Sequence, residues 1–169
     1  MIMDYKDLKN KTVVITGAQR GIGEAIARKF MEQGSSLVLV CRSHTPAIDD
    51  ILKQASSEQV AVIESDIRDL STISNWLENF ENKGNKVDVF VNNAGVFYTK
   101  ELIEATDDDW NDVMGTNLKA TFFLAQLFAR HMKKSGGGNI IQASSFAARI
   151  PSAFSGLYAA RSEEHTSEL

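Results

Sequence analysis

The segment from Thr16 to Gly23 has the composition of a phosphate-binding turn. It reads Thr-Gly-Ala-Gln-Arg-Gly-Ile-Gly and lies between an apolar run and an amphipathic run. Glycines allow positive φ angles and let a ligand approach the backbone closely. A helix that begins here offers free N–H groups and its positive dipole end to a pyrophosphate. The spacing therefore predicts a dinucleotide site, and a plain strand-to-helix turn is the alternative.

The residues that end the second apolar run bear on which dinucleotide fits. A carboxylate there would accept hydrogen bonds from a free ribose 2′-hydroxyl and favour NAD(H). Cys41 and Arg42 stand there instead, and Arg20 lies in the glycine-rich turn. Because two guanidinium groups suit a 2′-phosphate, we expect NADP(H) to be favoured over NAD(H). The alternative is that Arg42 is a solvated loop residue.

Short apolar runs alternate with helical patterns, which indicates a parallel sheet with crossover helices. The predicted strands are Lys11 to Thr16, Leu37 to Cys41, Val60 to Glu64, Val87 to Val91 and Asn139 to Ala143. The predicted helices are Gly21 to Gln33, Ala47 to Ser56, Leu70 to Asn82 and Asp107 to Lys134. We expect an α/β, doubly wound parallel sheet. Since such a sheet normally has about six strands, we expect it to be incomplete on its C-terminal side.

The last predicted helix has a capping signal and a broad apolar surface. Thr106 and Asp109 have the spacing of a capping box. The main stripe is Trp110, Val113, Met114, Asn117, Leu118, Thr121, Leu124, Ala125 and Phe128, and Phe122, Phe123 and Leu127 widen it. Two interpretations stay open: a subunit partner covers the outer face, or the helix is sunk between the sheet and neighbouring loops.

Composition excludes several classes of partner. The 169 residues suit one domain, and 18 Lys and Arg against 22 Asp and Glu give a net charge of −4. We expect no nucleic acid or membrane partner, because basic runs are absent and no apolar stretch reaches roughly 18 residues. The polar N-terminus and the single cysteine predict a cytoplasmic protein. No metal site is expected from His44, His131 and His165 at their spacings.

Residues 8 to 160 resemble the short-chain dehydrogenase/reductase family, because several motifs occur in the family's order. The glycine-rich turn resembles the family's cofactor turn, Asp66-Ile67 resembles its adenine-holding pair, and Asn92-Asn93-Ala94-Gly95 resembles its NNAG segment. The resemblance implies a Rossmann-like, three-layer α/β/α, NAD(P)-binding domain over residues 1–160. The cofactor-binding residues that it implies are Thr16, Gly17, Arg20, Gly21, Ile22, Gly23, Arg42, Asp66, Ile67, Asn93, Ala94 and Gly95.

Asn117, Ser145 and Tyr158 match the family's catalytic positions, and Tyr158 lies 13 residues after Ser145. Carbonyl reduction needs a proton donor and a group that stabilises the developing oxyanion. Tyr158 is the expected acid/base, and Ser145 is expected to polarise the carbonyl. The resemblance implies that Asn117 disturbs the long helix and supports a proton relay. On the residues alone, a structural asparagine bonded to a neighbouring loop is the alternative.

The pattern breaks after Tyr158. The family's Tyr-x-x-x-Lys motif requires a lysine at position 162, where this chain has serine. That lysine would favour the phenolate form and hold the nicotinamide ribose. Arg161 to Leu169 can be back-translated as AGATCGGAAGAGCACACGTCTGAACTC, which resembles a common sequencing-library adapter. We therefore treat residues 161–169 as a non-native tail on a C-terminally truncated member of the family. A natural truncated or inactive homologue is the alternative.

The expected activity is NADP(H)-dependent interconversion of a small-molecule ketone and a secondary alcohol. A 3-oxoacyl-[acyl-carrier-protein] reductase and a sugar or polyol dehydrogenase are the alternatives within the family. An inactive dinucleotide-binding protein is the alternative outside enzymes. The intact parent is expected to be a homodimer or homotetramer. The fragment is expected to expose an unpaired sheet edge and to lack measurable reductase activity.

Overall fold

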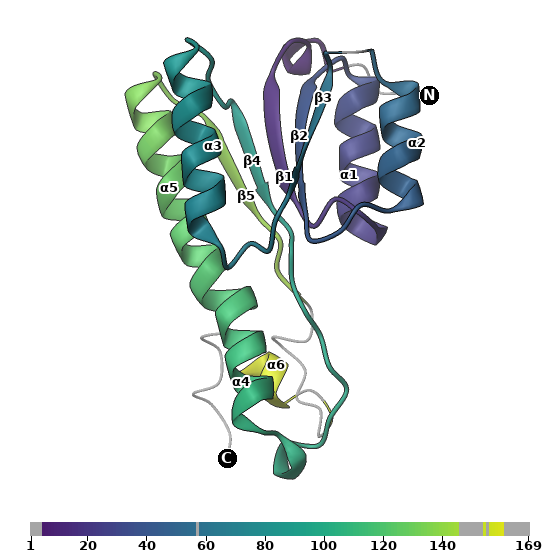
Figure 1. Cartoon of the computed structure of the whole chain (residues 1–169), viewed down its shortest axis with the longest axis vertical. Coiled ribbons are helices and arrows are strands. Elements are labelled where there is room, and N and C mark those ends of the chain that lie inside the picture. Colours follow the sequence, from purple (N-terminus) through teal and green to yellow (C-terminus); the bar gives the residue numbers. More distant parts are fainter. Residues whose placement is uncertain (1–4, 57, 146–153, 155, 161–169) are drawn as a thin grey trace.

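Strand β1 (Thr12–Thr16) lies at the centre of a parallel sheet whose order is β3-β2-β1-β4-β5. The computed structural model describes residues 5–56, 58–145, 154 and 156–160 (Figure 1). The other strands are β2 (Ser36–Cys41), β3 (Val60–Glu64), β4 (Val89–Asn92) and β5 (Asn139–Gln142). The helices are α1 (Gly21–Glu32), α2 (Pro46–Gln54), α3 (Leu70–Asn82), α4 (Asp107–Met114), α5 (Thr121–Lys134) and the short α6 (Gly156–Ala159). The predicted five-stranded, doubly wound sheet is confirmed in the described part of the chain.

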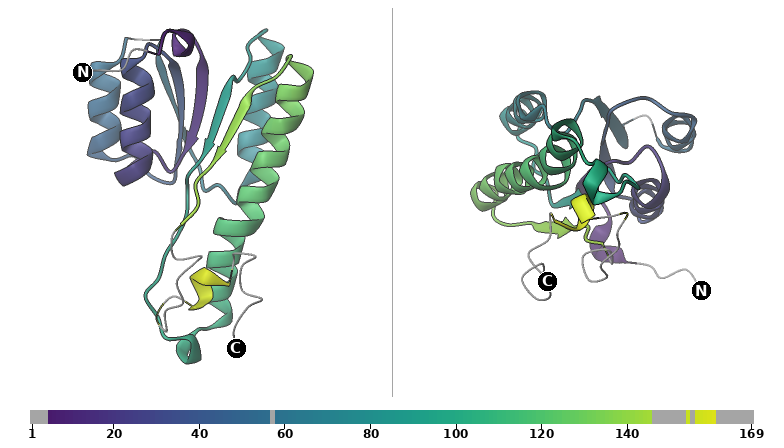
Figure 2. Two further views of the ribbon diagram at one scale, coloured as in Figure 1. Left: turned by 180° about the vertical axis from the view of Figure 1, so that it is seen from behind. Right: turned by 90° about the horizontal axis from the view of Figure 1, so that it is seen from below.

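Two helical layers cover the sheet. Helices α1 and α2 lie on one face and α3 and α5 on the other (Figures 1 and 2). Side chains alternate along β1, so Val13 and Ile15 pack toward α1 and α2 while Val14 packs toward α3 and α5. On the second face the Phe90 and Phe128 rings stack with their centroids 4.0 Å apart. Near-continuous apolar strands, which the sequence shows, are therefore buried on both sides.

The order of the strands reverses between β1 and β4. From β1 the chain moves outward to β2 and β3, and then returns to place β4 on the other side of β1. The carboxyl ends of β1 and β4 therefore diverge into connections that run to opposite faces. In open α/β sheets this switch point is where ligands bind.

The long predicted helix is one continuous rod with a local change of winding. A π-helical turn, η3 (Gly115–Ala120), separates α4 from α5 and contains Asn117. The predicted capping box is present, with the Thr106 hydroxyl and Asp109 carboxylate each bonded to the other's backbone N–H. Two residues of the predicted main stripe, Trp110 and Leu118, are 52% and 50% exposed. Trp110 is on α4, which projects beyond the sheet (Figure 1), and Leu118 on η3 lines a cavity.

The predicted start of the fourth strand at Val87 is also corrected. The backbone N–H of Val87 donates to Nε2 of the buried His131 at 2.8 Å, so it takes no part in the sheet. The other ring nitrogen of His131 pairs with Glu81 on α3. Registered pairing with β1 begins at Val89, and just before it the Asp88 N–H donates to the Thr12 carbonyl at 2.9 Å. A side chain of α5 thus binds the backbone N–H that precedes β4.

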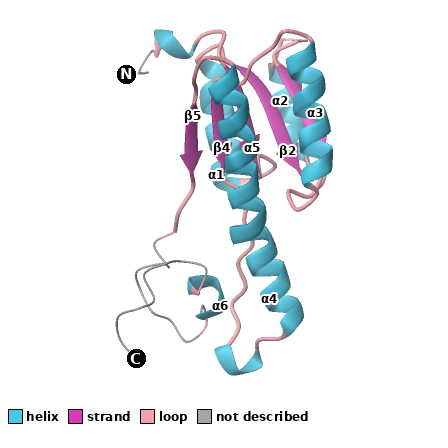
Figure 3. Ribbon diagram, turned by 90° about the vertical axis from the view of Figure 1, so that its left-hand side faces the viewer, coloured by secondary structure: helices cyan, strands magenta, loops and turns pink. Residues whose placement is uncertain are grey.

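The side of the sheet that ends in β5 is open. Strand β5 lies at the edge of the sheet (Figure 3). Every residue of β5 is exposed, including Ile140 at 38% and Ile141 at 47%. No strand of the described residues pairs with its outer edge. The expectation of an exposed apolar edge is therefore confirmed. Within the described residues, no helix has both the length and the apolar character needed to cross a membrane.

The caps of α3 and α4 predict how stability depends on pH. Hydrogen bonds from Ser71 and Thr72 lower the pKa of Asp69 from 3.8 to about 2, and those from Lys100 and Thr106 lower the pKa of Asp109 to about 2. Because both pKa values are depressed on folding, their stabilisation is present above about pH 4 and is lost as the pH falls toward 2. Carboxyl ¹³C shifts measured by NMR would report titration near pH 2. The neutral cap in Asp69→Asn should make the loss of unfolding free energy below pH 4 less steep, and midpoints near 3.8 would contradict the prediction.

Candidate functional site

The glycine-rich turn between β1 and α1 has the backbone geometry that its sequence predicts. Gly17 and Gly21 have φ angles of +69° and +57°, in the left-handed region that favours glycine. A Cβ on Gly23 would lie 2.2 Å from the carbonyl oxygen of Gly17, so only glycine fits. The turn therefore closes tightly before α1 begins. No side chain among the described residues caps α1, and its first N–H groups remain available to an anion.

A set of hydrogen bonds holds this turn against the end of β4. The hydroxyl of the fully buried Thr16 accepts from the backbone N–H groups of Asn93 and Ala94, both at 3.0 Å, and donates to Asn92 Oδ1 at 3.4 Å. The Asn93 amide donates to the carbonyls of Thr16 and Gly17 at 3.1 and 3.4 Å. Thr16 and the Asn93 amide therefore hold the two walls of the site together.

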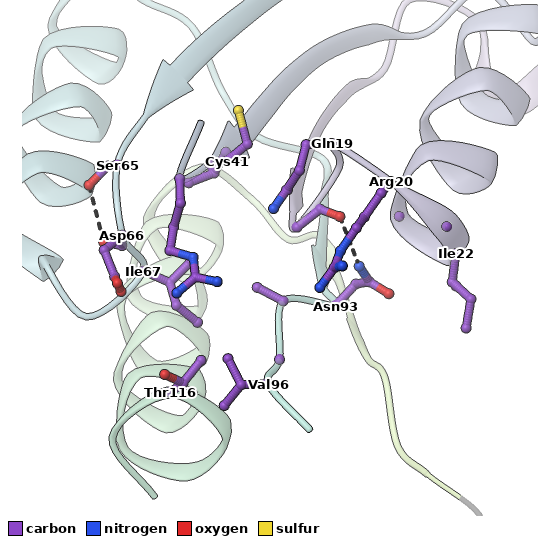
Figure 4. Close-up of a pocket in the computed structure, with 17 residues that line it drawn as sticks. Gln19, Arg20, Ile22, Cys41, Ser65, Asp66, Ile67, Asn93, Val96 and Thr116 are labelled. Carbon is purple, nitrogen blue, oxygen red and sulfur yellow. Dashed lines mark hydrogen bonds between the residues drawn. The ribbon is translucent and has the colours of Figure 1, made fainter. Parts of the chain in front are cut away.

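A cavity of about 270 Å³ opens at the switch point between these walls. Figure 4 shows Asp66 and Ile67 on one side, Gln19 and Arg20 on the other, and Val96 and Thr116 below. Oε1 of Gln19 is buried without a hydrogen-bond partner among the described residues.

The three arginines around this cavity differ in their pairing. The Arg68 guanidinium, just outside the lining, pairs with Asp66 and Asp112 at 2.7 Å each. Its hydrogen bonds hold the pKa of Asp66 below the ordinary value. Arg20 and Arg42 both line the cavity, and within the described part of the chain neither guanidinium has an ion pair or hydrogen bond. Two cations are therefore available to an anionic ligand.

Asn117 on η3 makes a two-way contact with the segment that follows β4. Its Nδ2 donates to the Val96 carbonyl at 2.7 Å, and its Oδ1 accepts from the Val96 N–H at 2.8 Å. Both hydrogen-bonding groups of the amide are thus bonded to a neighbouring loop, as expected if Asn117 is a structural asparagine. The predicted disturbance of the helix is present as the π-helical turn. A catalytic role for Asn117 stays a prediction.

Ser145, Tyr158 and Asn117 line a second cavity of about 550 Å³, next to the first. The two cavities share Asn93 to Val96 and Ile22. The half-buried Tyr158 ring on α6 meets Phe97 edge to face, with centroids 4.9 Å apart. The predicted catalytic residues therefore line a cavity that adjoins the first one, and Ile22 of the glycine-rich turn lines both cavities. Position 162, Arg161 and His165 lie outside the described residues.

Nearly all predicted cofactor residues line the first cavity. Those that do are Gly17, Arg20, Gly21, Ile22, Gly23, Arg42, Asp66, Ile67, Asn93, Ala94 and Gly95, whereas Thr16 is buried behind it. The lining residues outside the predicted set are Gln19, Val40, Cys41, Ser65, Val96 and Thr116. All but Thr116 lie within or next to predicted motifs and could have been found by extending them. Thr116 lies on η3, and only the path of the long helix places this residue beside the cavity.

The comparisons agree with this geometry. The family model described as short chain dehydrogenase matches residues 11–161. The chain belongs to the short-chain dehydrogenase family. It is 33% identical to a 3-oxoacyl-[acyl-carrier-protein] reductase of Chlamydia pneumoniae, over 90% of this chain and 62% of that protein. It is 30% identical to the NAD-dependent glycerol dehydrogenase of Listeria innocua, over 85% of this chain and 56% of that one.

A solved structure of a short-chain dehydrogenase from Streptomyces avermitilis has the same fold. The TM-score is 0.81 at 26% identity, over 90% of this chain and 55% of that one. The matched family is, by its description, one of dehydrogenases. The chain spans about three fifths of the length of the curated relatives that it matches.

Substitution of Gly23 tests the turn. We expect Gly23→Ala to lower the thermal midpoint and to abolish dinucleotide binding, because its Cβ would overlap the Gly17 carbonyl. Gly115→Ala is the matched control, since Gly115 has αR angles and its Cβ would meet Arg68 at 3.5 Å, an ordinary contact. Calorimetric melting and titration with NADPH measure both effects. Unchanged binding by Gly23→Ala would contradict the proposed fit of the turn.

Proposed function

We propose that this chain is the dinucleotide-binding portion of an NADP(H)-dependent oxidoreductase that interconverts a ketone and a secondary alcohol. The observation that carries the proposal is a cavity at the switch point of the sheet, lined by an uncapped helix N-terminus and two unpaired guanidinium groups. A dinucleotide is the ligand whose chemistry matches all of these groups.

Different groups around the cavity suit different parts of a dinucleotide. The pyrophosphate is held at the N-terminus of α1, where the absence of a Cβ on Gly17 and Gly23 lets it approach the backbone. Asp66 and Ile67 lie on the side where the resemblance places the adenine ring. The residues present therefore fit the group.

The choice of NADP(H) over NAD(H) rests on charge. Arg20 and Arg42 line the cavity and form no ion pair or hydrogen bond with the described residues, although the charge of Arg42 contributes to lowering the pKa of Asp66. Arg68, in contrast, is already paired with two carboxylates. A 2′-phosphate takes bidentate hydrogen bonds from guanidinium groups. The similar glycerol dehydrogenase is named as NAD-dependent, so the preference needs direct measurement.

The proposed chemistry uses the residues of the second cavity. The bound nicotinamide supplies or accepts the hydride. Ser145 donates a hydrogen bond to the substrate oxygen and polarises the carbonyl, and Tyr158 transfers the proton to or from that oxygen. Asn117 holds the Val96 segment at the junction of the two cavities. Its support of a proton relay belongs to this proposal.

The substrate proposed first is a 3-oxoacyl thioester on a carrier protein, because a relative at 33% identity is a reductase of that name. A sugar or polyol is the second candidate, favoured by the similar glycerol dehydrogenase. We further propose that the intact protein is a cytoplasmic homodimer or homotetramer. Phe122 and Phe123 on α5, 59% and 39% exposed, support a subunit contact there.

Removing the cation after β2 tests the cofactor preference. We expect Arg42→Ala to weaken NADPH binding at least about tenfold, because a hydrogen-bonded charge pair is lost. NADH affinity should change by less than about twofold. Lys53→Ala is the control, because Lys53 is an exposed cation of α2 outside the cavity. Isothermal titration with both nucleotides measures the ratio, and equal losses for NADPH and NADH would contradict a 2′-phosphate contact.

Turnover tests the proposed reaction. The 169-residue chain should consume no NADPH with β-ketoacyl thioesters or ketosugars, because Ser162 stands where the family requires lysine. The protein encoded by the genomic reading frame beyond codon 160 should be active with one of these substrates. In that protein Tyr158→Phe should lower kcat by about 10²- to 10⁴-fold and leave NADPH affinity unchanged. Turnover by the present chain, or an unaffected Tyr158→Phe variant, would overturn this assignment.

A further inference from the structure

Arg68 joins three segments of the chain behind the cavity. Its Nε and Nη2 donate to Oδ1 and Oδ2 of Asp66 at 3.0 and 2.7 Å. Its Nη1 donates to Oδ1 of Asp112 on α4 at 2.7 Å. The hydroxyl of Tyr98, in the segment after β4, donates to the other oxygen of Asp112. One guanidinium thus connects the β3–α3 loop with α4, and through Asp112 with Tyr98.

This arrangement fixes the Asp66 carboxylate in one orientation. Oδ1 also accepts the backbone N–H of Arg68 at 2.9 Å, so both oxygens are held from the same side. Each carboxylate oxygen has more than one acceptor direction, and Asp66 is a lining residue of the cavity. The remaining acceptor capacity is therefore available to a ligand while the carboxylate cannot rotate freely.

The anchor of Arg68 lies close to the change in helical winding. A Cβ on Gly115, the first residue of η3, would lie 3.5 Å from Cδ of Arg68, so the arginine stem passes directly over this residue. Asp112 lies one turn earlier on the same rod. The loop that carries Asp66 is thereby fixed relative to the helix that carries Asn117.

We propose that Arg68 is a positioning residue for adenine recognition, which holds the Asp66 carboxylate to accept a hydrogen bond from the exocyclic amine of adenine, with Asp112 as its anchor. The inference rests on the proposed dinucleotide function. A planar fork is required because it meets both oxygens of Asp66 and one of Asp112 at once, whereas an ammonium group is a single compact donor centre. The exclusive pairing of Arg68 with carboxylates also separates it from Arg20 and Arg42, which are available to phosphate.

The test compares NADPH with its deamino analogue, in which hypoxanthine replaces adenine and the exocyclic amine is absent. The 169-residue chain should bind NADPH about tenfold more tightly than the analogue, the ratio expected for one hydrogen bond to a charged acceptor. Arg68→Lys should reduce this ratio to within about twofold of unity. Asp112→Ala, which removes only the anchor, should reduce it to between two- and fivefold. A general loss of stability would weaken both ligands alike and leave the ratio unchanged.

Arg28→Lys is the matched control, because Arg28 also donates to a carboxylate, Glu24, through Nε and Nη2 at 2.9 Å but does not line the cavity. It should retain the tenfold ratio. If the unmodified chain binds neither ligand, the proposed function fails. If it binds both equally, or if Arg68→Lys and Asp112→Ala retain the full ratio, the function stands and the role of Arg68 is overturned. Should Arg68→Lys fail to fold by circular dichroism, Asp112→Ala decides.

Discussion

The hydrogen bonds between the ends of β1 and β4 are the interaction on which the rest of this site depends. These two strands carry the chain to opposite faces of the sheet, so their ends would separate unless something joined them. The Thr16 hydroxyl and the Asn93 amide do so with short side chains that reach backbone groups of the other strand. Because every partner is a buried or half-buried polar group, losing one member would leave others unsatisfied.

The same network extends into the long helix. Asn92 donates to the Thr121 carbonyl at 2.9 Å and to Gln142 at 3.2 Å, while the Thr121 hydroxyl donates to the Thr116 carbonyl at 3.1 Å. These side-chain bonds reach a carbonyl of the π-helical turn, that of Thr116, and the carbonyl of Thr121, the first residue of α5. The irregular winding at Asn117 is thus stabilised by the polar groups that hold the dinucleotide cavity together.

Prediction from sequence succeeded where the signal is local. The bounds of β3 and α3 match the predicted ranges, because β3 is a short apolar run and α3 has apolar periodicity and a capping aspartate, Asp69. Prediction failed where a contact with a distant part of the chain determines the local structure. The N–H of Val87, at the predicted start of the fourth strand, is bonded to His131, 44 positions away, and the 52% exposure of Trp110 depends on how far α4 projects past the sheet. Neither signal lies near the element that it changes.

The sequence by itself determined the parallel α/β arrangement, the glycine turn and the order of the family motifs, because these depend on residue type and spacing along the chain. Only the tertiary structure decided what Arg68 does. Arg20 and Arg42 stand at motif positions that the sequence already assigned to the cofactor site, whereas Arg68 is paired with Asp112 across 44 residues. Ion pairing acts over a few ångströms, so the role of each cation is fixed by which distant segments the fold brings together.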